Sequence, residues 1–114
     1  MSLNVERLSK TLSRELSILL SREAKDANLA SVTITEVRVT NDLSYANVYY
    51  IVPEYLKEKI VGSLDKAKGF LRSELARRVK ARKMPELVFK YDEALEYGNH
   101  INEIINKLNK NDYI

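Results

Sequence analysis

Residues 31–52 decide the fold of this chain, and they read SVTITEVRVTNDLSYANVYYIV. β-branched and aromatic residues dominate both halves of this stretch, and such residues favour strands. Turn-forming residues occupy positions 41–44, between the two halves. The stretch therefore predicts a hairpin whose strands cover residues 31–40 and 45–52.

The first predicted strand changes its pattern halfway. Its apolar residues fall on one side of an extended chain before residue 35 and on the other side after residue 36. Side chains alternate between the two faces of a strand, so one extra residue produces such a change of side. The pattern therefore predicts a β-bulge near Thr35 or Glu36.

Helical periodicity precedes the hairpin. Apolar residues recur at spacings of three and four from Val5 to Leu19, behind the candidate N-caps Ser2 and Asn4. This spacing predicts an amphipathic helix that ends near Lys25. The cations on its polar face are Arg7, Lys10, Arg14 and Arg22.

Helical periodicity returns after Pro53 and continues from Leu56 to Val79, with an interruption at Gly69. Glycine lowers helix stability and gives the backbone extra freedom. We therefore expect two helices that meet at a kink formed by Ala67 and Gly69.

The Met84-Pro85 pair is expected to end the second of these helices, because proline disfavours a helical conformation in the residue before it. Residues 87–91 then read as a third strand, and residues 98–114 as a C-terminal helix. The order helix, strand, strand, helix, kink, helix, strand predicts an α+β domain with a three-stranded sheet covered on one side by helices. This order matches the type II K-homology (KH-like) arrangement, although the Gly-Xaa-Xaa-Gly loop of that nucleic-acid module is missing.

The composition indicates one domain over residues 1–114, a length that suits a single hydrophobic core. The absence of cysteine excludes disulfides and Cys-based zinc sites, and it suits a reducing compartment. No apolar stretch is long enough for a spanning helix, and the N-terminus does not read as a signal peptide. The sequence therefore predicts a cytoplasmic protein that makes no membrane contact.

The strongest functional signal is a basic run between residues 66 and 83. Eight cations stand there against one acid, Glu74, in a chain whose net charge is +3. The eight residues of this basic run are Lys66, Lys68, Arg72, Arg77, Arg78, Lys80, Arg82 and Lys83. Segregated positive charge favours a polyanionic partner, and nucleic acid fits best. We therefore predict that the basic run contacts RNA phosphates.

A solvated helix face is the alternative explanation for the basic run. Neighbouring residues such as Arg77 and Arg78 point about 100° apart on a helix. The eight cations therefore cannot all face one ligand, and only a subset is expected to contact RNA.

The aromatic residues leave a second choice open. Four tyrosines cluster on and after the second predicted strand, namely Tyr45, Tyr49, Tyr50 and Tyr55. Such rings either stack on unpaired bases or pack against other side chains. Packing is favoured for Tyr50, which alternates in phase with apolar residues, whereas both readings stay open for Tyr49. Phe70 and Phe89 are expected in the core.

Catalysis is not indicated, because the chain lacks a Walker loop, a nucleophile elbow and a glycine-rich phosphate cradle. The sole histidine, His100, has no second imidazole or cysteine nearby, so a surface position is favoured over a metal or catalytic role. We expect no enzyme activity, cofactor or metal. The remaining alternative from another class is a KH-like adaptor that binds protein partners only.

Three groups of segments carry a family resemblance. The second half of the chain contributes Ala67-Lys68-Gly69-Phe70-Leu71-Arg72, Arg82, Pro85-Glu86-Leu87, Phe89 and Tyr91-Asp92. The first half contributes Lys25-Asp26, Val32-Thr33-Ile34-Thr35, Val37, Asp42-Leu43 and Ala46-Asn47-Val48-Tyr49. The C-terminal stretch contributes Glu96-Tyr97-Gly98 and Ile101. In their order along the chain, the segments resemble bacterial ribosome-binding factor A, with departures at Ala27-Asn28, where Pro-Arg is usual, and at Ala94, where serine is common.

The resemblance implies a cytoplasmic, non-catalytic factor that binds the free 30S ribosomal subunit and contacts 16S ribosomal RNA. It implies a role in late 30S maturation and in efficient growth in the cold. The RNA contact would include the 5′-terminal helix region, where the factor would assist 16S 5′-end processing. We expect the protein to act as a monomer.

Overall fold

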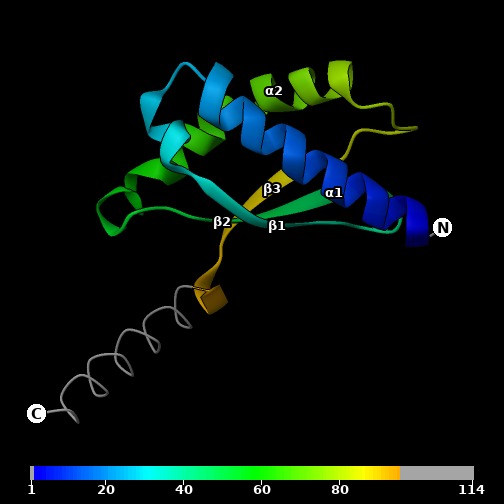
Figure 1. Cartoon of the computed structure of the whole chain (residues 1–114), viewed down its shortest axis with the longest axis horizontal. Helices are drawn as coiled ribbons and strands as arrows, with labels where there is room; N and C mark the ends of the chain where they lie inside the picture. The colour runs from blue at the N-terminus through cyan, green and yellow to red at the C-terminus, as the bar shows by residue number, and fades with distance from the viewer. Residues whose placement is uncertain (1, 96–114) are drawn as a thin grey trace, which may run out of the picture.

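Two long helices cover one face of a three-stranded sheet (Figure 1). The computed structural model describes residues 2–95, with side chains described from residue 4 onward. The predicted α+β class and three-stranded sheet are confirmed within this range. The predicted C-terminal helix over residues 98–114, and His100 with it, lie outside the described residues.

The described elements follow one another with short connections. They are α1 (Ser2–Ile18), the π-helical turn η1 (Leu19–Glu23), the 3-10 turn η2 (Ala27–Ser31), β1 (Thr33–Val39), β2 (Tyr45–Ile51), the 3-10 turn η3 (Glu54–Leu56), α2 (Lys59–Arg78) and β3 (Glu86–Tyr91). Because η1 continues directly from α1, the first helical segment ends at Glu23, close to the predicted end at Lys25.

Strand β2 lies at the centre of the sheet, between β1 and β3. β1 pairs with β2 in the antiparallel direction, with Val37 opposite Val48. β3 pairs with β2 in the parallel direction, with Phe89 opposite Val48. A parallel pair needs a crossover connection, and α2 supplies it.

The predicted β-bulge is confirmed, because the β1–β2 register shifts between Ile34 and Glu36. Thr35 occupies the bulge, and its hydroxyl donates a 2.6 Å hydrogen bond to the carboxylate of Asp92, just after β3. This hydrogen bond is the main reason that the pKa of Asp92 lies below its ordinary value. The bulge in edge strand β1 is therefore hydrogen-bonded to the residue that follows β3, the opposite edge strand.

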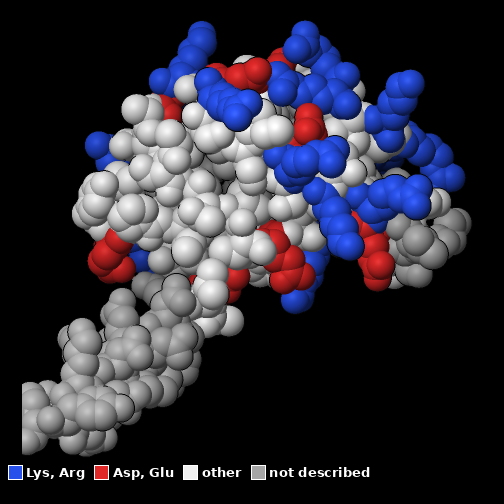
Figure 2. Space-filling model, in the orientation of Figure 1, with Lys and Arg blue, Asp and Glu red and all other residues white. Residues whose placement is uncertain are grey.

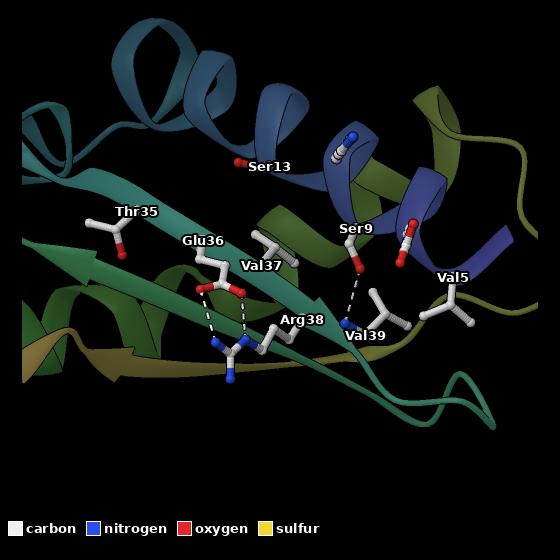
Figure 3. Close-up of a pocket in the computed structure, with 10 residues that line it drawn as sticks. Val5, Ser9, Ser13, Thr35, Glu36, Val37, Arg38 and Val39 are labelled. Atoms are coloured by element: carbon white, nitrogen blue, oxygen red, sulfur yellow. Dashed lines mark hydrogen bonds and ion pairs between the residues drawn. The ribbon is translucent and has the colours of Figure 1, made fainter. Parts of the chain in front are cut away.

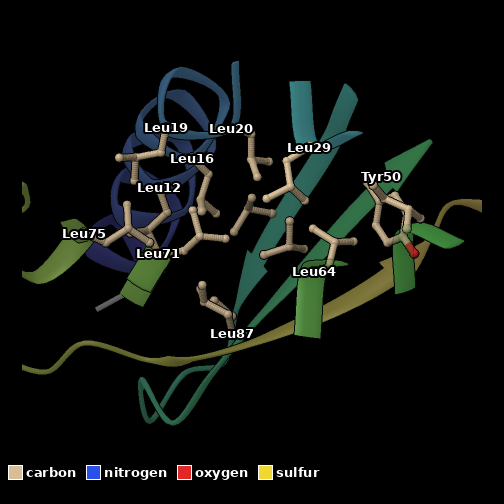
Figure 4. Close-up of a cluster of buried hydrophobic side chains, with 14 of the residues drawn as sticks. Leu12, Leu16, Leu19, Leu20, Leu29, Tyr50, Leu64, Leu71, Leu75 and Leu87 are labelled. Carbon is tan, nitrogen blue, oxygen red and sulfur yellow. The ribbon is translucent and has the colours of Figure 1, made fainter. Parts of the chain in front are cut away.

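The core lies between the helices and the sheet and consists mainly of leucine (Figure 4). Its fully buried members include Leu12 and Leu16 of α1, Leu19 and Leu20 of η1, Leu64, Leu71 and Leu75 of α2, and Leu87 of β3. Complete burial of one such side chain stabilises a fold by about 1.5–3 kcal/mol. This shared core holds both helices on the same face of the sheet.

Aromatic residues extend the core towards one end of the sheet. Tyr50 is 3% exposed, and its ring meets Phe89 and Tyr91 edge-on, with centroids 6.4 and 5.6 Å away. The prediction that Tyr50 packs inside is therefore confirmed. Phe89 is partly buried against the core. The prediction for Phe70 is wrong, because this side chain is 44% exposed, and neighbouring Leu71 takes the inward position on α2.

Helix α2 is continuous from Lys59 to Arg78, whereas the sequence predicts two helices that meet at Gly69. Glycine keeps its backbone N–H, so it weakens a helix without removing a hydrogen bond from it. The buried residues Leu71 and Leu75, which follow Gly69, hold the helix on the core. A bend of the axis at Ala67 and Gly69 within this single helix stays a prediction.

The expected helix end at Met84-Pro85 is also wrong, because α2 ends at Arg78. Val79 adopts an extended conformation, and its N–H bonds to the carbonyl of Leu75 at 2.8 Å. The chain then runs as an irregular α2–β3 loop over residues 79–85. Part of the basic run therefore lies on a loop and not on a helix.

The turn between β1 and β2 is built around Asp42. Its carboxylate accepts hydrogen bonds from the backbone N–H of Ser44, at 3.0 Å, and from the hydroxyl of Thr40, at 2.8 Å. These hydrogen bonds, with the Ser44 N–H contributing most, lower the pKa of Asp42 from 3.8 to about 2. Leu43 adopts a positive φ of 62°, and its side chain packs against the core. The Asp42 hydrogen bonds help to hold Leu43 in this conformation.

We expect Gly69→Ala to raise the free energy of unfolding by about 1 kcal/mol, because alanine is favoured over glycine by that amount inside a helix. A Cβ atom added at Gly69 would meet no atom within 4 Å, so packing does not oppose the change. Gly62→Ala is the matched control, since Gly62 lies in the same helix and is equally open. Urea denaturation measures both variants. A loss of stability confined to Gly69→Ala would instead support a bend at this residue.

We expect Asp42→Asn to flatten the dependence of stability on pH below pH 4. A carboxyl whose pKa falls on folding stabilises the native state above its ordinary pKa of 3.8. That contribution is lost as the pH falls from 3.8 towards about 2, and an amide at position 42 cannot lose it. Melting temperatures measured across this range test the expectation. Asp65→Asn, on the exposed side of α2, serves as control, and an identical slope in both variants would contradict the role of Asp42.

Candidate nucleic-acid interface

The basic run is divided between a helix and a loop. Its residues on α2 are Lys66, Lys68, Arg72, Arg77 and Arg78, and those on the α2–β3 loop are Lys80, Arg82 and Lys83. The structure thus places the eight cations on two elements with different neighbours. Their hydrogen bonds and ion pairs separate cations that hold the fold together from cations that face solvent.

Arg72 fastens the α2–β3 loop to α2. Its guanidinium donates a 2.9 Å hydrogen bond to the carbonyl of Met84 and a 3.3 Å hydrogen bond to the carbonyl of Pro85. These carbonyls stand immediately before β3. Arg72 is therefore engaged in positioning the end of the loop.

Arg78 links α2 to the first helical segment. Its guanidinium donates to the carboxylate of Glu23, at the end of η1, and to that of Glu74 at 3.4 Å. The hydrogen bond from Arg78 lowers the pKa of Glu23. The Arg78 side chain is only 25% exposed, so these contacts are shielded more than those of a surface pair. Arg78 therefore has a structural role.

Two further cations on α2 pair with acids along the same helix. Arg77 lies 3.1 Å from Glu74, and Lys68 lies 4.0 Å from Asp65. Each pair has one largely exposed partner, Arg77 at 70% and Asp65 at 79%, and pairs open to solvent are weak, typically below about 1 kcal/mol. Lys68 and Arg77 can therefore leave these partners for an anion that binds them more strongly, such as a phosphate group.

The side chains of Lys66, Lys80, Arg82 and Lys83 form no hydrogen bond or ion pair with any residue in the described range 2–95. Three of these four lie on the α2–β3 loop. The predicted run therefore holds its unpaired charge mainly beyond the end of α2.

A groove of about 1030 Å³ lies between the start of α1, the β1–β2 turn and the α2–β3 loop. We call it the cationic groove, and its lining residues are Asn4, Val5, Arg7, Leu8, Thr11, Asn41, Leu43, Arg78, Val79, Lys80, Ala81 and Arg82. Four of them are cations and none is Asp or Glu. Figure 2 shows Lys and Arg side chains gathered over the end of the molecule where α1 begins and the α2–β3 loop runs.

Arg7 joins this site from outside the basic run. The sequence places Arg7 on the polar face of the first helix but gives no reason to group it with residues 78–82. Only the packing of α1 beside α2 brings them to one groove. A charge pattern along the chain could not reveal that they line one groove, because about seventy positions separate the two segments.

A second hollow, of about 540 Å³, lies between α1 and β1 (Figure 3). The hydroxyl of Ser9 accepts a 3.1 Å hydrogen bond from the backbone N–H of Val39, so α1 covers part of this sheet edge. The charged residues that line the hollow are Glu6, Lys10, Glu36 and Arg38. Acids and cations are balanced here, so this hollow lacks the single sign of charge found in the cationic groove.

The tyrosines outside the core differ in exposure. Tyr45 is 47% exposed and Tyr55 is 81% exposed. Tyr49 is half-buried beneath the guanidinium of Arg38, which lies 5.6 Å from the ring centroid. This contact occupies part of the ring but leaves both readings of Tyr49, packing and base stacking, as predictions.

The described part of the chain contains no group of three or more His, Cys, Asp or Glu residues that could hold a metal ion. None of its helices combines the length and the apolar character that crossing a membrane requires. The features that stand out in residues 2–95 are thus the unpaired cations and the groove beside them.

Comparison with known proteins shows which family the chain matches. Residues 4–105 match the family model described as ribosome-binding factor A. The chain is 45% identical to ribosome-binding factor A of Macrococcus caseolyticus over 112 residues, covering 96% of this chain and 98% of that protein. It is 43% identical to the Enterococcus faecalis protein of the same name over 107 residues, covering 91% and 92%.

Solved structures agree with the sequence comparison. The crystal structure of ribosome-binding factor A from Thermus thermophilus matches with a TM-score of 0.68 and 31% identity, over 76% of this chain and 94% of that chain. A homology model of the Thermus thermophilus factor, fitted into a cryo-EM map of a 30S–RbfA complex, matches with a TM-score of 0.61 and 30% identity, over 76% and 93%. With this fold, these relatives and a family match over most of its length, the chain belongs to the ribosome-binding factor A family.

Proposed function

We propose that this chain is a non-catalytic factor that binds the free 30S subunit through 16S ribosomal RNA and assists late maturation of that subunit. Family membership makes it a ribosome-binding factor. The fitted model of the Thermus thermophilus relative, in a 30S–RbfA complex, supports the 30S subunit as the partner. The finer parts of the proposal are contact with the 5′-terminal helix region, assistance to 16S 5′-end processing and efficient growth in the cold.

The single observation that carries the proposal is the unpaired positive charge on the α2–β3 loop. Lys80, Arg82 and Lys83 have no hydrogen-bond or ion-pair partner within residues 2–95 and extend from a loop whose two ends are fixed. A phosphate backbone supplies closely spaced negative charge, and its neutralisation releases condensed counterions. The loop therefore favours RNA over a neutral protein surface.

Recognition of this kind depends on RNA shape more than on sequence. Phosphate contacts position a protein on nucleic acid without identifying bases. The loop carries both kinds of cation. The lysine ammonium is a compact point charge and the arginine guanidinium is a planar group with several N–H donors, and both bind phosphate oxygens well. We therefore propose that the folded shape of the 16S RNA and the neighbouring ribosomal surface provide most of the specificity.

The protein is proposed to work in the cytoplasm as a monomer. The proposed site uses only charge and shape, so the proposal includes no cofactor. A KH-like adaptor that binds protein partners alone predicts a different outcome in the experiment that follows.

The test is cosedimentation of the protein with purified 30S subunits on sucrose gradients at low and high salt. If the four cations of the basic run that have no partner within residues 2–95 each bind one phosphate, the affinity for 30S subunits falls roughly a hundredfold between about 50 and 200 mM salt. Migration with 30S subunits at low salt and loss at high salt is the expected result. Binding that is absent, or that salt does not weaken, would contradict RNA contact and favour the adaptor.

Charge reversal locates the contact. The triple variant Lys80→Glu, Arg82→Glu, Lys83→Glu is expected to lose 30S association, since three phosphate contacts become repulsive. A matched triple variant with the same net charge is Lys10→Glu, Arg22→Glu, Lys25→Glu, whose positions lie outside the basic run. Equal loss in both variants would show that overall charge, and not the loop, determines binding.

A further inference from the structure

We infer that the cationic groove holds a stretch of RNA sugar–phosphate backbone, with Arg7 of α1 as the contact on the wall opposite the α2–β3 loop. This inference rests on the proposed function, because it specifies how the RNA is held. It adds a residue outside the basic run and assigns one face of the molecule to the contact. The charges, the lining and the rigidity of the groove support it.

The charges of the groove have one sign and little internal compensation. Arg7, Lys80 and Arg82 form no hydrogen bond or ion pair with any other side chain or backbone group in residues 2–95. The chain has sixteen acids, yet none lines the groove. Like charges placed together repel one another and destabilise the free protein. A polyanion in the groove removes that repulsion.

Arg78 makes a different contribution to the same wall. Its guanidinium is already bonded to Glu23 and Glu74, so it is committed to holding α2 against η1. Arg78 therefore positions the start of the loop, and Lys80 and Arg82 follow from it towards the groove. The contacts to RNA are thus assigned to Arg7, Lys80 and Arg82.

The rest of the lining suits a backbone better than a stack of bases. No Phe, Tyr, Trp or His is among the lining residues, so the groove offers no aromatic platform for bases. The polar residues that line it, Asn4, Thr11 and Asn41, carry both donors and acceptors. Such groups can bond to phosphate oxygens and to the ribose 2′-hydroxyl.

Hydrogen bonds hold two walls of the groove, the α2–β3 loop and the β1–β2 turn, in place in the free protein. The N–H of Glu86 bonds to the carbonyl of Ser44 at 2.9 Å, which joins the end of the α2–β3 loop to the β1–β2 turn. Arg72 fastens the same end of the loop to α2, and Asp42 closes the turn. Binding to a preformed site loses little conformational entropy. Two of the three walls, the α2–β3 loop and the β1–β2 turn, are therefore joined to each other before RNA binds.

The experiment compares Arg7→Gln with Lys10→Gln on the full chain. Both residues are exposed cations of α1, but Lys10 lines the balanced hollow beside β1 and not the cationic groove. Binding is measured against purified 30S subunits and against protein-free 16S ribosomal RNA, from about 50 to 200 mM salt. Arg7→Gln is expected to weaken both interactions and to reduce the slope of log affinity against log salt by about 1. Lys10→Gln is expected to leave the slope unchanged.

Three outcomes are distinguished. If the wild type binds and Arg7→Gln binds with the same affinity and salt slope as Lys10→Gln, the groove assignment is overturned. The proposed function is unaffected by that result. Weaker binding to 30S subunits with unchanged binding to 16S RNA also overturns it, because the groove would then take an acidic protein segment. A wild type that binds neither target contradicts both the proposed function and the inference drawn from it.

A structural explanation for any loss is tested separately. Arg7 has no hydrogen-bond or ion-pair partner within residues 2–95, so Arg7→Gln should keep the wild-type circular dichroism spectrum and melting temperature. Arg7→Lys retains one positive charge and is expected to keep most of the affinity that Arg7→Gln loses, since lysine also binds phosphate, as a point charge. Failure of Arg7→Lys to restore binding would contradict a simple phosphate contact.

Discussion

The parallel pairing of β2 with β3 is the constraint on which the rest of the structure depends. A tight turn cannot join parallel strands, so the chain leaves the sheet after β2, crosses its face as α2 and returns through residues 79–85. The return ends beside the β1–β2 turn, where Glu86 bonds to Ser44. The loop, the turn and the start of α1 consequently meet at one end of the sheet, and the cationic groove forms between them.

The features that the sequence predicts correctly are those that depend on patterns among neighbouring residues. A strand's alternation, a helix's spacing and the position of turn formers all depend on residues close together in the chain. Even the bulge at residues 34–36 is visible as a change of side among apolar residues. The hairpin, the third strand and the layered α+β arrangement follow from these local patterns, and the inward position of Tyr50 follows from its phase along β2.

The features that the sequence does not predict depend on packing between distant segments. Gly69 reads as a break, yet the buried leucines of α2 stabilise a continuous helix through it. Phe70 reads as core because it is large and apolar, but Leu71 takes the inward position and leaves it exposed. Arg7 reads as one cation among several on α1, and only the neighbouring helix and loop make it part of a groove.

The basic run also shows why residue type alone does not assign function. Arg72 and Arg78 have the same charge as Lys80 and Arg82 and lie close to them in sequence. The first two already donate to backbone carbonyls or carboxylates, and a cation so engaged must give up those partners before it can bind phosphate. The other two have no such partners among residues 2–95 and can bind an anion without that loss. Arg72 and Arg78 therefore stabilise the fold, whereas Lys80 and Arg82 on the loop stay available to an anion.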